Sequence, residues 1–207
     1  GILPNGEWGI IAEAKYMNDI IPEQAFYEKK TLYFFTFPEM VVEIAADAFG
    51  QTSLSGALVI PDDVKVIGYH TFSNTNISTV EFSSKLERIG SDAFYNCRSL
   101  SGNISFPNSL TYIGNSAFYG CFFSGRLKLP DSLEYIGGDA FSYSGNFTGD
   151  LLIPEKLTAL SGSTFYYTNF SGSLILNNVQ SIGHHCFGSC NFKGDLVIPE
   201  GVSEIED

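Results

Sequence analysis

The chain has 207 residues, of which 44% are apolar and 16% are charged, and its formal net charge is −12. Such a surface would repel a phosphate backbone, so we expect no nucleic-acid partner, and an anionic membrane is disfavoured for the same reason. No apolar run comes near the roughly 18 residues that a membrane-spanning helix needs, so we expect no membrane insertion within this chain.

A phenylalanine recurs along the chain at steps of 22 to 24 residues. It closes the pattern Ile-Gly-x-x-Ala-Phe, which is complete at Ile113–Phe118. The recurring residues are Phe26, Phe49, Phe72, Phe94, Phe118, Phe141, Phe165 and Phe187. A fixed period in this range indicates a solenoid, in which each repeat packs only on its neighbours.

The beginning of the chain does not follow this repeat. We predict that residues 1–20 form an N-terminal cap, with Trp8 as a plug over the first repeat. Residues 21–207 are predicted to form a solenoid of about eight repeats with a truncated last repeat. Because the final unit stops at Ile205-Glu206-Asp207, before its Ala-Phe, we expect the native protein to continue beyond residue 207.

Each repeat has four parts: an apolar anchor, a small turn residue, a short strand ending in Pro, and the Ile-Gly-x-x-Ala-Phe element. In the strand Leu58–Pro61, period-2 alternation places Leu58 and Ile60 inside and Val59 outside, and Pro61 ends the strand. We expect the strands that end at residues 38, 61, 83, 107, 130, 154, 177 and 199 to pair in parallel as one sheet. Between Gly and Phe we expect a tight or 3₁₀-like turn, because the segment is too short for an α-helix.

The combined pattern Leu-x-Ile-Pro-x-x-Leu-x-x-Ile-Gly-x-x-Ala-Phe closely resembles the BspA-like class of bacterial leucine-rich repeats. The segment from Leu127 to Phe141 shows every position of the motif, and the resemblance covers about residues 21–207. Repeat and resemblance together predict a β-rich α/β solenoid. This is a leucine-rich-repeat horseshoe with a parallel β-sheet on one face and short turns or 3₁₀ segments on the other. The resemblance also implies an exported protein, extracellular or attached to the cell surface, that takes part in adhesion.

The four cysteines fit the repeat rather than a reactive site. Cys97, Cys121 and Cys190 each follow a recurring Phe by three positions, where other repeats have Thr or Ser, and Cys186 replaces a recurring Ala. We interpret all four as small buried residues and expect no metal site, because a ladder supplies one donor per repeat rather than a converging set. A disulfide between Cys97 and Cys121, which lie in adjacent repeats, is geometrically conceivable.

Catalytic constellations are not evident in the sequence. His70, His184 and His185 lie at variable positions between Gly and Phe, on the outer turns. Scattered Ser and Asp residues show no pattern that would place a nucleophile, a base and an orienting acid together. We therefore expect neither catalysis nor a cofactor.

Two sets of residues are candidates for partner binding. On the outward face of the predicted sheet, Arg126 and Lys128 form a basic spot flanked by Asp150, and Leu152, Ile175 and Val197 form an apolar stripe. Exposed apolar stripes often mark contacts, although β-branched residues also suit any strand. The second set is a row of Tyr95, Tyr119 and Tyr166, with Tyr143 and Tyr167 beside it, which could stack on sugars, contact a protein or shield the turns.

Two functional hypotheses follow. The first is a non-catalytic adhesion module that recognises a protein or a glycan on host or other cells, through the sheet face or the tyrosine row. The alternative is a structural spacer in a larger surface protein. The repeat defines the architecture, and the choice of ligand depends on the positions that vary.

Overall fold

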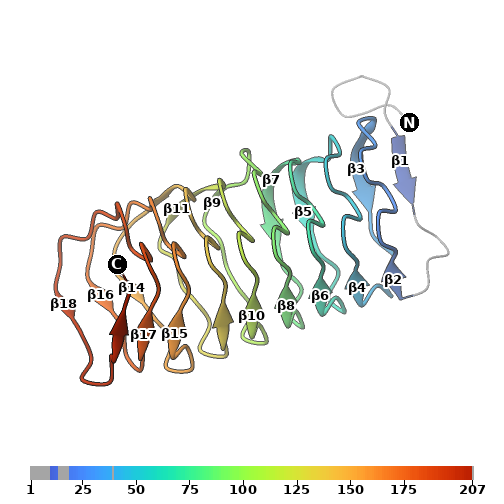
Figure 1. Cartoon of the computed structure of the whole chain (residues 1–207). Coiled ribbons are helices and arrows are strands. Elements are labelled where there is room, and N and C mark those ends of the chain that lie inside the picture. Colours follow the sequence, from blue (N-terminus) through green and yellow to red (C-terminus); the bar gives the residue numbers. More distant parts are fainter. Residues whose placement is uncertain (1–9, 14–18, 39, 207) are drawn as a thin grey trace.

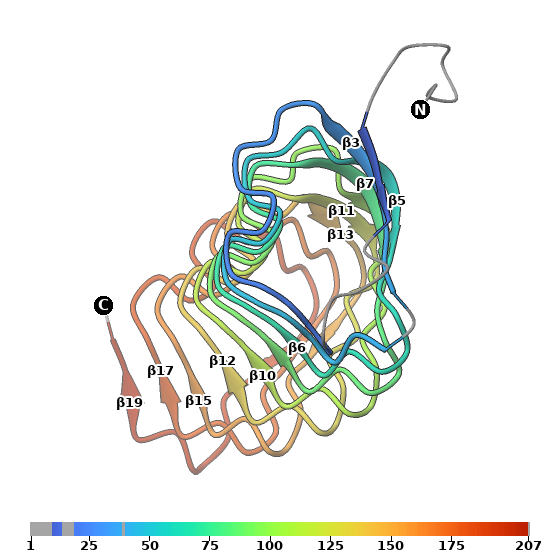
Figure 2. The ribbon, with the colours of Figure 1, turned by 90° about the vertical axis from the view of Figure 1, so that its right-hand side faces the viewer.

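The computed structural model describes residues 10–13, 19–38 and 40–206. Trp8 and most of the predicted cap lie outside these residues. Within them, every coil of the chain passes once around a common core, and successive coils stack side by side from the N-terminal to the C-terminal end (Figure 1). Over this length the stack is a gently twisted slab, so the curvature of the predicted horseshoe is shallow (Figures 1 and 2).

One face of the stack is a ladder of two-residue strands at the Ile of each Ile-Gly pair. The first six form one parallel sheet and the last three form another. The strands are β2 (Ile20–Ile21), β4 (Glu43–Ile44), β6 (Val66–Ile67), β8 (Arg88–Ile89), β10 (Tyr112–Ile113), β12 (Tyr135–Ile136), β15 (Ala159–Leu160), β17 (Ser181–Ile182) and β19 (Glu204–Ile205).

The opposite face, seen on the right in Figure 2, carries the segments predicted as a single sheet. It is instead divided into four parallel ladders: β1–β3, β5–β7, β9–β11–β13 and β14–β16–β18. The strands are β1 (Ile10–Glu13), β3 (Leu32–Thr36), β5 (Ser55–Val59), β7 (Asn76–Glu81), β9 (Ser101–Gly102), β11 (Phe122–Gly125), β13 (Asn146–Phe147), β14 (Leu151–Leu152), β16 (Leu174–Ile175) and β18 (Leu196–Val197).

The expected in-and-out alternation on this face holds even where strand pairing does not. The predicted strands over 104–107 and 127–130 are not paired as strands. Nevertheless Leu127 and Leu129 are buried and Lys128 between them is exposed. Burial of alternate side chains therefore orients this segment without a hydrogen-bonded ladder.

The prediction of an α/β class with 3₁₀ segments is wrong for the described part of the chain, which contains strands and turns but no helix. The turns alternate between two kinds of hydrogen bond. Ser116 and Phe118 each donate their N–H to a carbonyl of the next coil at 2.9 Å, whereas Ala117 bonds back to Gly114 at 3.4 Å. Ser116 adopts φ +50°, which directs its N–H along the stack instead of into a helix.

Stacked phenylalanines fill the core behind these turns. The eight recurring rings form one continuous column, with centroids 5.1 to 5.9 Å apart. A second column of Phe123, Phe147, Phe170 and Phe192 begins halfway along the stack. The recurring Phe is therefore a stacking residue, as the repeat predicts.

The recurring Gly is required because consecutive coils approach closely there. A Cβ atom on Gly114 would lie 2.4 Å from the backbone nitrogen of Ser91 in the preceding coil. At the equivalent position Ser161 does carry a Cβ, and its hydroxyl, 3.1 Å away, donates to the carbonyl of Ile136. The Ile-Gly ladder is divided at this coil, between β12 and β15.

Candidate binding surfaces

The six residues predicted on the sheet face line two adjoining hollows. Arg126, Lys128, Asp150 and Leu152 line a hollow of about 360 Å³ together with Ile175. Ile175 also lines the neighbouring hollow of about 400 Å³, in which Val197 lies. The two hollows thus form one sheet-face groove that crosses β14, β16 and β18.

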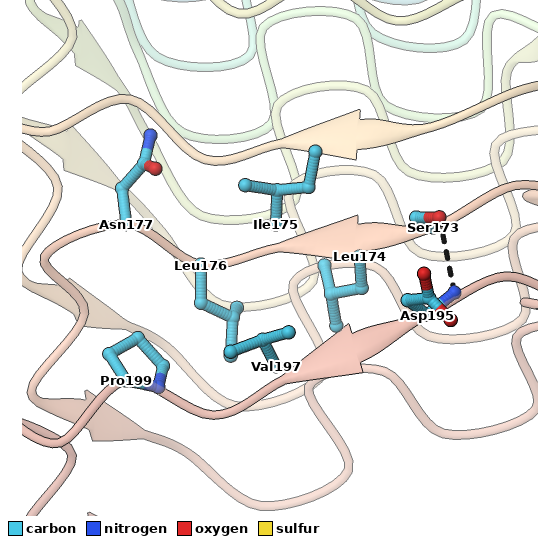
Figure 3. A pocket seen from close by; sticks show the side chains of 8 residues that line it. All are labelled: Ser173, Leu174, Ile175, Leu176, Asn177, Asp195, Val197 and Pro199. Atoms are coloured by element: carbon cyan, nitrogen blue, oxygen red, sulfur yellow. Dashed lines mark hydrogen bonds between the residues drawn. The ribbon is translucent and has the colours of Figure 1, made fainter.

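An apolar stripe runs along the sheet-face groove. Leu152 pairs in register with Ile175, and Ile175 with Val197, so one of these side chains emerges from each of three successive coils. They are 49%, 42% and 70% exposed, respectively. In Figure 3, Leu174 and Leu176 leave the chain on the side opposite to Ile175, and both are buried. The strand alternation therefore places the stripe on the solvent side, as predicted.

The basic end of the groove carries two exposed cations that are not neutralised by an ion pair among the described residues. Arg126 and Lys128 are exposed, and neither forms an ion pair within the described residues. By contrast, Lys65, Lys85 and Lys156 each pair with a carboxylate of an adjacent coil. In a chain of net charge −12, these two neighbouring cations give this end of the groove a local positive charge.

Asp150 has a structural contact as well as a place in the groove. Its Oδ1 accepts a hydrogen bond from the backbone N–H of Ser173 in the next coil at 2.7 Å. The Ser173 hydroxyl in turn accepts from the backbone N–H of Asp195 at 3.1 Å (Figure 3). These bonds tie coils together where the ladders are short, so Asp150 contributes to the shape of the groove before any partner binds.

The tyrosine row is present but packs differently from the prediction. Tyr95 and Tyr119 stack at 5.0 Å, and both are half-buried, as is Tyr166. Tyr143 links the row, because its ring lies 5.4 Å from Tyr119 and 5.5 Å from Tyr166. The most exposed members are Tyr143 and its stacking partner Tyr167, which the sequence placed beside the row.

Cys97, Cys121 and Cys186 are buried as predicted, whereas Cys190 is only partly buried, and all four cysteines are free. Burial raises the pKa of the Cys97 thiol to about 11 and that of Cys186 to about 12. The Sγ atoms of Cys97 and Cys121 donate to the carbonyls of Phe72 and Phe94 in the preceding coils. They take the place of hydroxyls such as Thr168 in the same column, so their role here is packing and not nucleophilic chemistry.

The histidines lie on the outer turns, as predicted. His70 lies between Asp47 and Asp92 of the adjacent coils, at 3.5 and 3.8 Å, and His184 lies 3.6 Å from Glu206. The His184–Glu206 contact is exposed and of the kind that contributes little stability, whereas His70, Asp47 and Asp92 are partly buried. Within the ranges that the structure describes, no group of three His, Cys, Asp or Glu side chains could hold a metal ion, and no helix could cross a membrane.

A third surface combines Tyr143 and Tyr167, which the sequence places beside the tyrosine row, with residues that the sequence does not single out. Phe122, Tyr143 and Tyr167 line a groove of about 450 Å³, and the amides of Asn146 and Asn169 lie beside them. We call it the aromatic groove. Its signal in the sequence is a tyrosine in each of two successive coils, two positions after the recurring Phe, where other coils have Glu, Gln, Asn, Gly or Ser.

The geometry defines the class of protein: a parallel β-solenoid of the leucine-rich-repeat type. The model of the BspA type leucine rich repeat region matches six copies in the chain, at residues 19–148 and 101–207. The chain therefore belongs to the BspA-type leucine-rich-repeat family. No curated protein sequence matches it.

Two solved structures show the same fold at low sequence identity. A leucine-rich repeat protein from Bacteroides ovatus has a TM-score of 0.61 and 21% identity, and the match covers 95% of this chain and 62% of that protein. A leucine-rich repeat protein from T. pallidum has a TM-score of 0.51 and 24% identity, covering 89% of this chain and 81% of that one. The chain thus spans less than two thirds of the length of the Bacteroides protein.

Proposed function

We propose that the chain is a non-catalytic recognition module of an exported bacterial surface protein, and that its sheet-face groove binds a protein on host or other cells. Membership of the family supports a binding or scaffold role, and the placement outside the cell follows the family resemblance. The observation that carries the proposal is the in-register stripe of Leu152, Ile175 and Val197 beside two unpaired cations.

The chemistry of the groove favours one kind of protein partner. Apolar side chains that stay exposed on three successive coils lose contact with water when a partner covers them. Arg126 and Lys128 would attract a carboxylate on the same partner and orient it on the stripe. We therefore propose a protein segment that presents apolar side chains next to Asp or Glu.

A subtractive display selection tests this proposal. A peptide library is selected on the immobilised protein, and the selected peptides are titrated against the wild type and a Leu152→Asp/Ile175→Asp variant. Val59→Asp is the matched control, because Val59 is exposed at the same strand position in an earlier coil, outside the groove. We expect peptides rich in apolar and acidic residues, with affinity reduced at least tenfold by the double variant and unchanged by the control.

Two results would contradict the proposal. Peptides that bind the double variant as tightly as the wild type would show that the stripe is not the contact. Peptides that are insensitive to an Arg126→Ala/Lys128→Ala variant and carry no acidic residue would show that the basic spot has no role.

A further inference from the structure

The aromatic groove lies on a different part of the molecule from the sheet-face groove, and the two share no lining residue. We propose that the aromatic groove is a second binding site, and that its ligand is an uncharged glycan, with sugar rings packed on Tyr143, Tyr167 and Phe122. This site stands independently of the protein-binding groove.

The first evidence is the backbone of the two tyrosines. The residue two positions after each recurring Phe adopts a left-handed conformation in every coil, and φ is +54° at Tyr143 and +56° at Tyr167. The other coils place small or polar residues there: Glu28, Gln51, Asn74, Asn96, Gly120 and Ser189. A bulky aromatic side chain is unfavourable in this region of φ and ψ, and two in succession indicate a functional use of the position.

The second evidence is the exposure of the rings. Phe122, Tyr143 and Tyr167 are 53%, 42% and 58% exposed. Tyr143 and Tyr167 stack with their centroids 5.2 Å apart and an angle of 25° between the rings, whereas no ring of the described residues stacks on Phe122. Because Tyr143 and Tyr167 cover part of each other, the surface open to the apolar C–H faces of sugar rings is their remaining exposed area together with the Phe122 ring.

The third evidence is the polar lining. The groove contains the amides of Asn146 and Asn169 and the residue Ser189, and no charged side chain lines it. The Nδ2 of Asn169 lies 3.5 Å from the Oδ1 of Asn146, which leaves one amide NH₂ group and one amide oxygen for a ligand. Donors and acceptors side by side match sugar hydroxyls, which both donate and accept. A neutral lining in a strongly acidic chain favours an uncharged ligand over an anionic one.

An extra residue shapes the groove. Phe147 follows Phe141 by six positions, whereas the same step takes five positions in both neighbouring coils, from Phe118 to Phe123 and from Phe165 to Phe170. Gly145 lies in this longer step at φ +93°, and a Cβ there would lie 2.4 Å from the carbonyl oxygen of Phe123. The longer connection therefore passes close to the preceding coil, and Gly145 lines the aromatic groove without a side chain that would fill it.

The test uses the whole chain and defined probes. Neutral pentasaccharides of glucose, mannose and xylose, and an oligogalacturonate as the acidic probe, are titrated by calorimetry. The test variant is Tyr143→Asn/Tyr167→Asn, because Asn occupies the same position at Asn74 and Asn96 and suits the left-handed backbone. Tyr135→Asn is the matched control, since Tyr135 is similarly exposed but lies on the Ile-Gly ladder.

We expect binding of at least one neutral pentasaccharide, at least tenfold weaker in the Asn variant and unchanged in the control and in Leu152→Asp/Ile175→Asp. The Asn variant should be at least as resistant to urea as the wild type, which separates lost binding from lost folding. Three results would overturn the proposal: no binding of any neutral probe, tighter binding of the acidic probe, or binding that survives the Asn variant. A selected peptide that depends on Tyr143 and Tyr167 while no sugar binds would assign the groove to protein instead.

Discussion

The stacking column of phenylalanines makes a quantitative prediction at Phe118. This ring is fully buried and lies between Phe94 at 5.3 Å and Phe141 at 5.2 Å. A buried aromatic side chain removes about 150–250 Å² from water, which corresponds to about 4–6 kcal/mol at roughly 25 cal/mol per Å². Because the neighbouring rings relax partly into the space, we expect Phe118→Ala to lower the free energy of unfolding by about 4 kcal/mol.

The matched control is Phe122→Ala, four positions along the chain. The same side chain is removed, but Phe122 is about half exposed and no described ring stacks on it, so we expect a loss of about 1 kcal/mol. Equilibrium urea unfolding followed by circular dichroism compares the two midpoints, and hydrogen exchange checks that the coils unfold together. Equal losses in the two variants would refute the assignment of the recurring Phe as the core of the solenoid.

Three further predictions follow from single coils. The Ser142 hydroxyl is buried without a partner among the described residues, whereas the Ser144 hydroxyl donates a hydrogen bond to the preceding coil. In urea unfolding, Ser142→Ala should stabilise the protein by about 1 kcal/mol and Ser144→Ala should destabilise it by about 1–2 kcal/mol. The opposite order would contradict this assignment of the two hydroxyls. Gly114→Ala should lower the free energy of unfolding by about 2–3 kcal/mol because of the backbone contact described above. Gly102 has open space around it but φ +78°, so Gly102→Ala should lower it by only about 1 kcal/mol. Similar thermal midpoints for the two variants would disprove the close approach at Gly114. Burial raises the pKa of the Cys97 thiol from 9.0 to about 11. The contribution of the protonated thiol to stability is therefore complete below pH 9 and is lost as the pH rises to about 11. Cys97→Ala should make the fall in urea midpoint between pH 9 and 11 less steep, and an unchanged slope would contradict the burial of this thiol.

The sequence predicts the parts of this fold that repeat. Ile113, Gly114, Ala117 and Phe118 each have one role, and that role is visible because most coils have the same residue at the equivalent position. The orientation of Leu152 and Ile175 could be predicted as well, since alternation along a strand depends only on which residues are buried.

The parts that failed depend on contacts between coils. The length of the turn alone predicts a 3₁₀ segment, whereas the left-handed residue Ser116 directs its N–H to the next coil. The division of the sheets could not be predicted either, because a side chain at the Gly position does not decide it alone: Ala45 follows β4, which pairs with both β2 and β6. The two tyrosines of the aromatic groove are visible in the repeat, but the sequence does not show that Phe122, Asn146 and Asn169 line the same groove.

The central claim is that recognition takes place on the exposed, variable positions of the sheet face. Hydrogen–deuterium exchange of the chain with and without a selected peptide tests it most directly. The account predicts slower exchange confined to residues 126–128, 150–152, 173–175 and 195–197, where the groove lies, and unchanged exchange at the turns around Phe49 and Phe72. Protection that falls on the turns or on the Ile-Gly ladder, with none at Leu152 and Ile175, would contradict it.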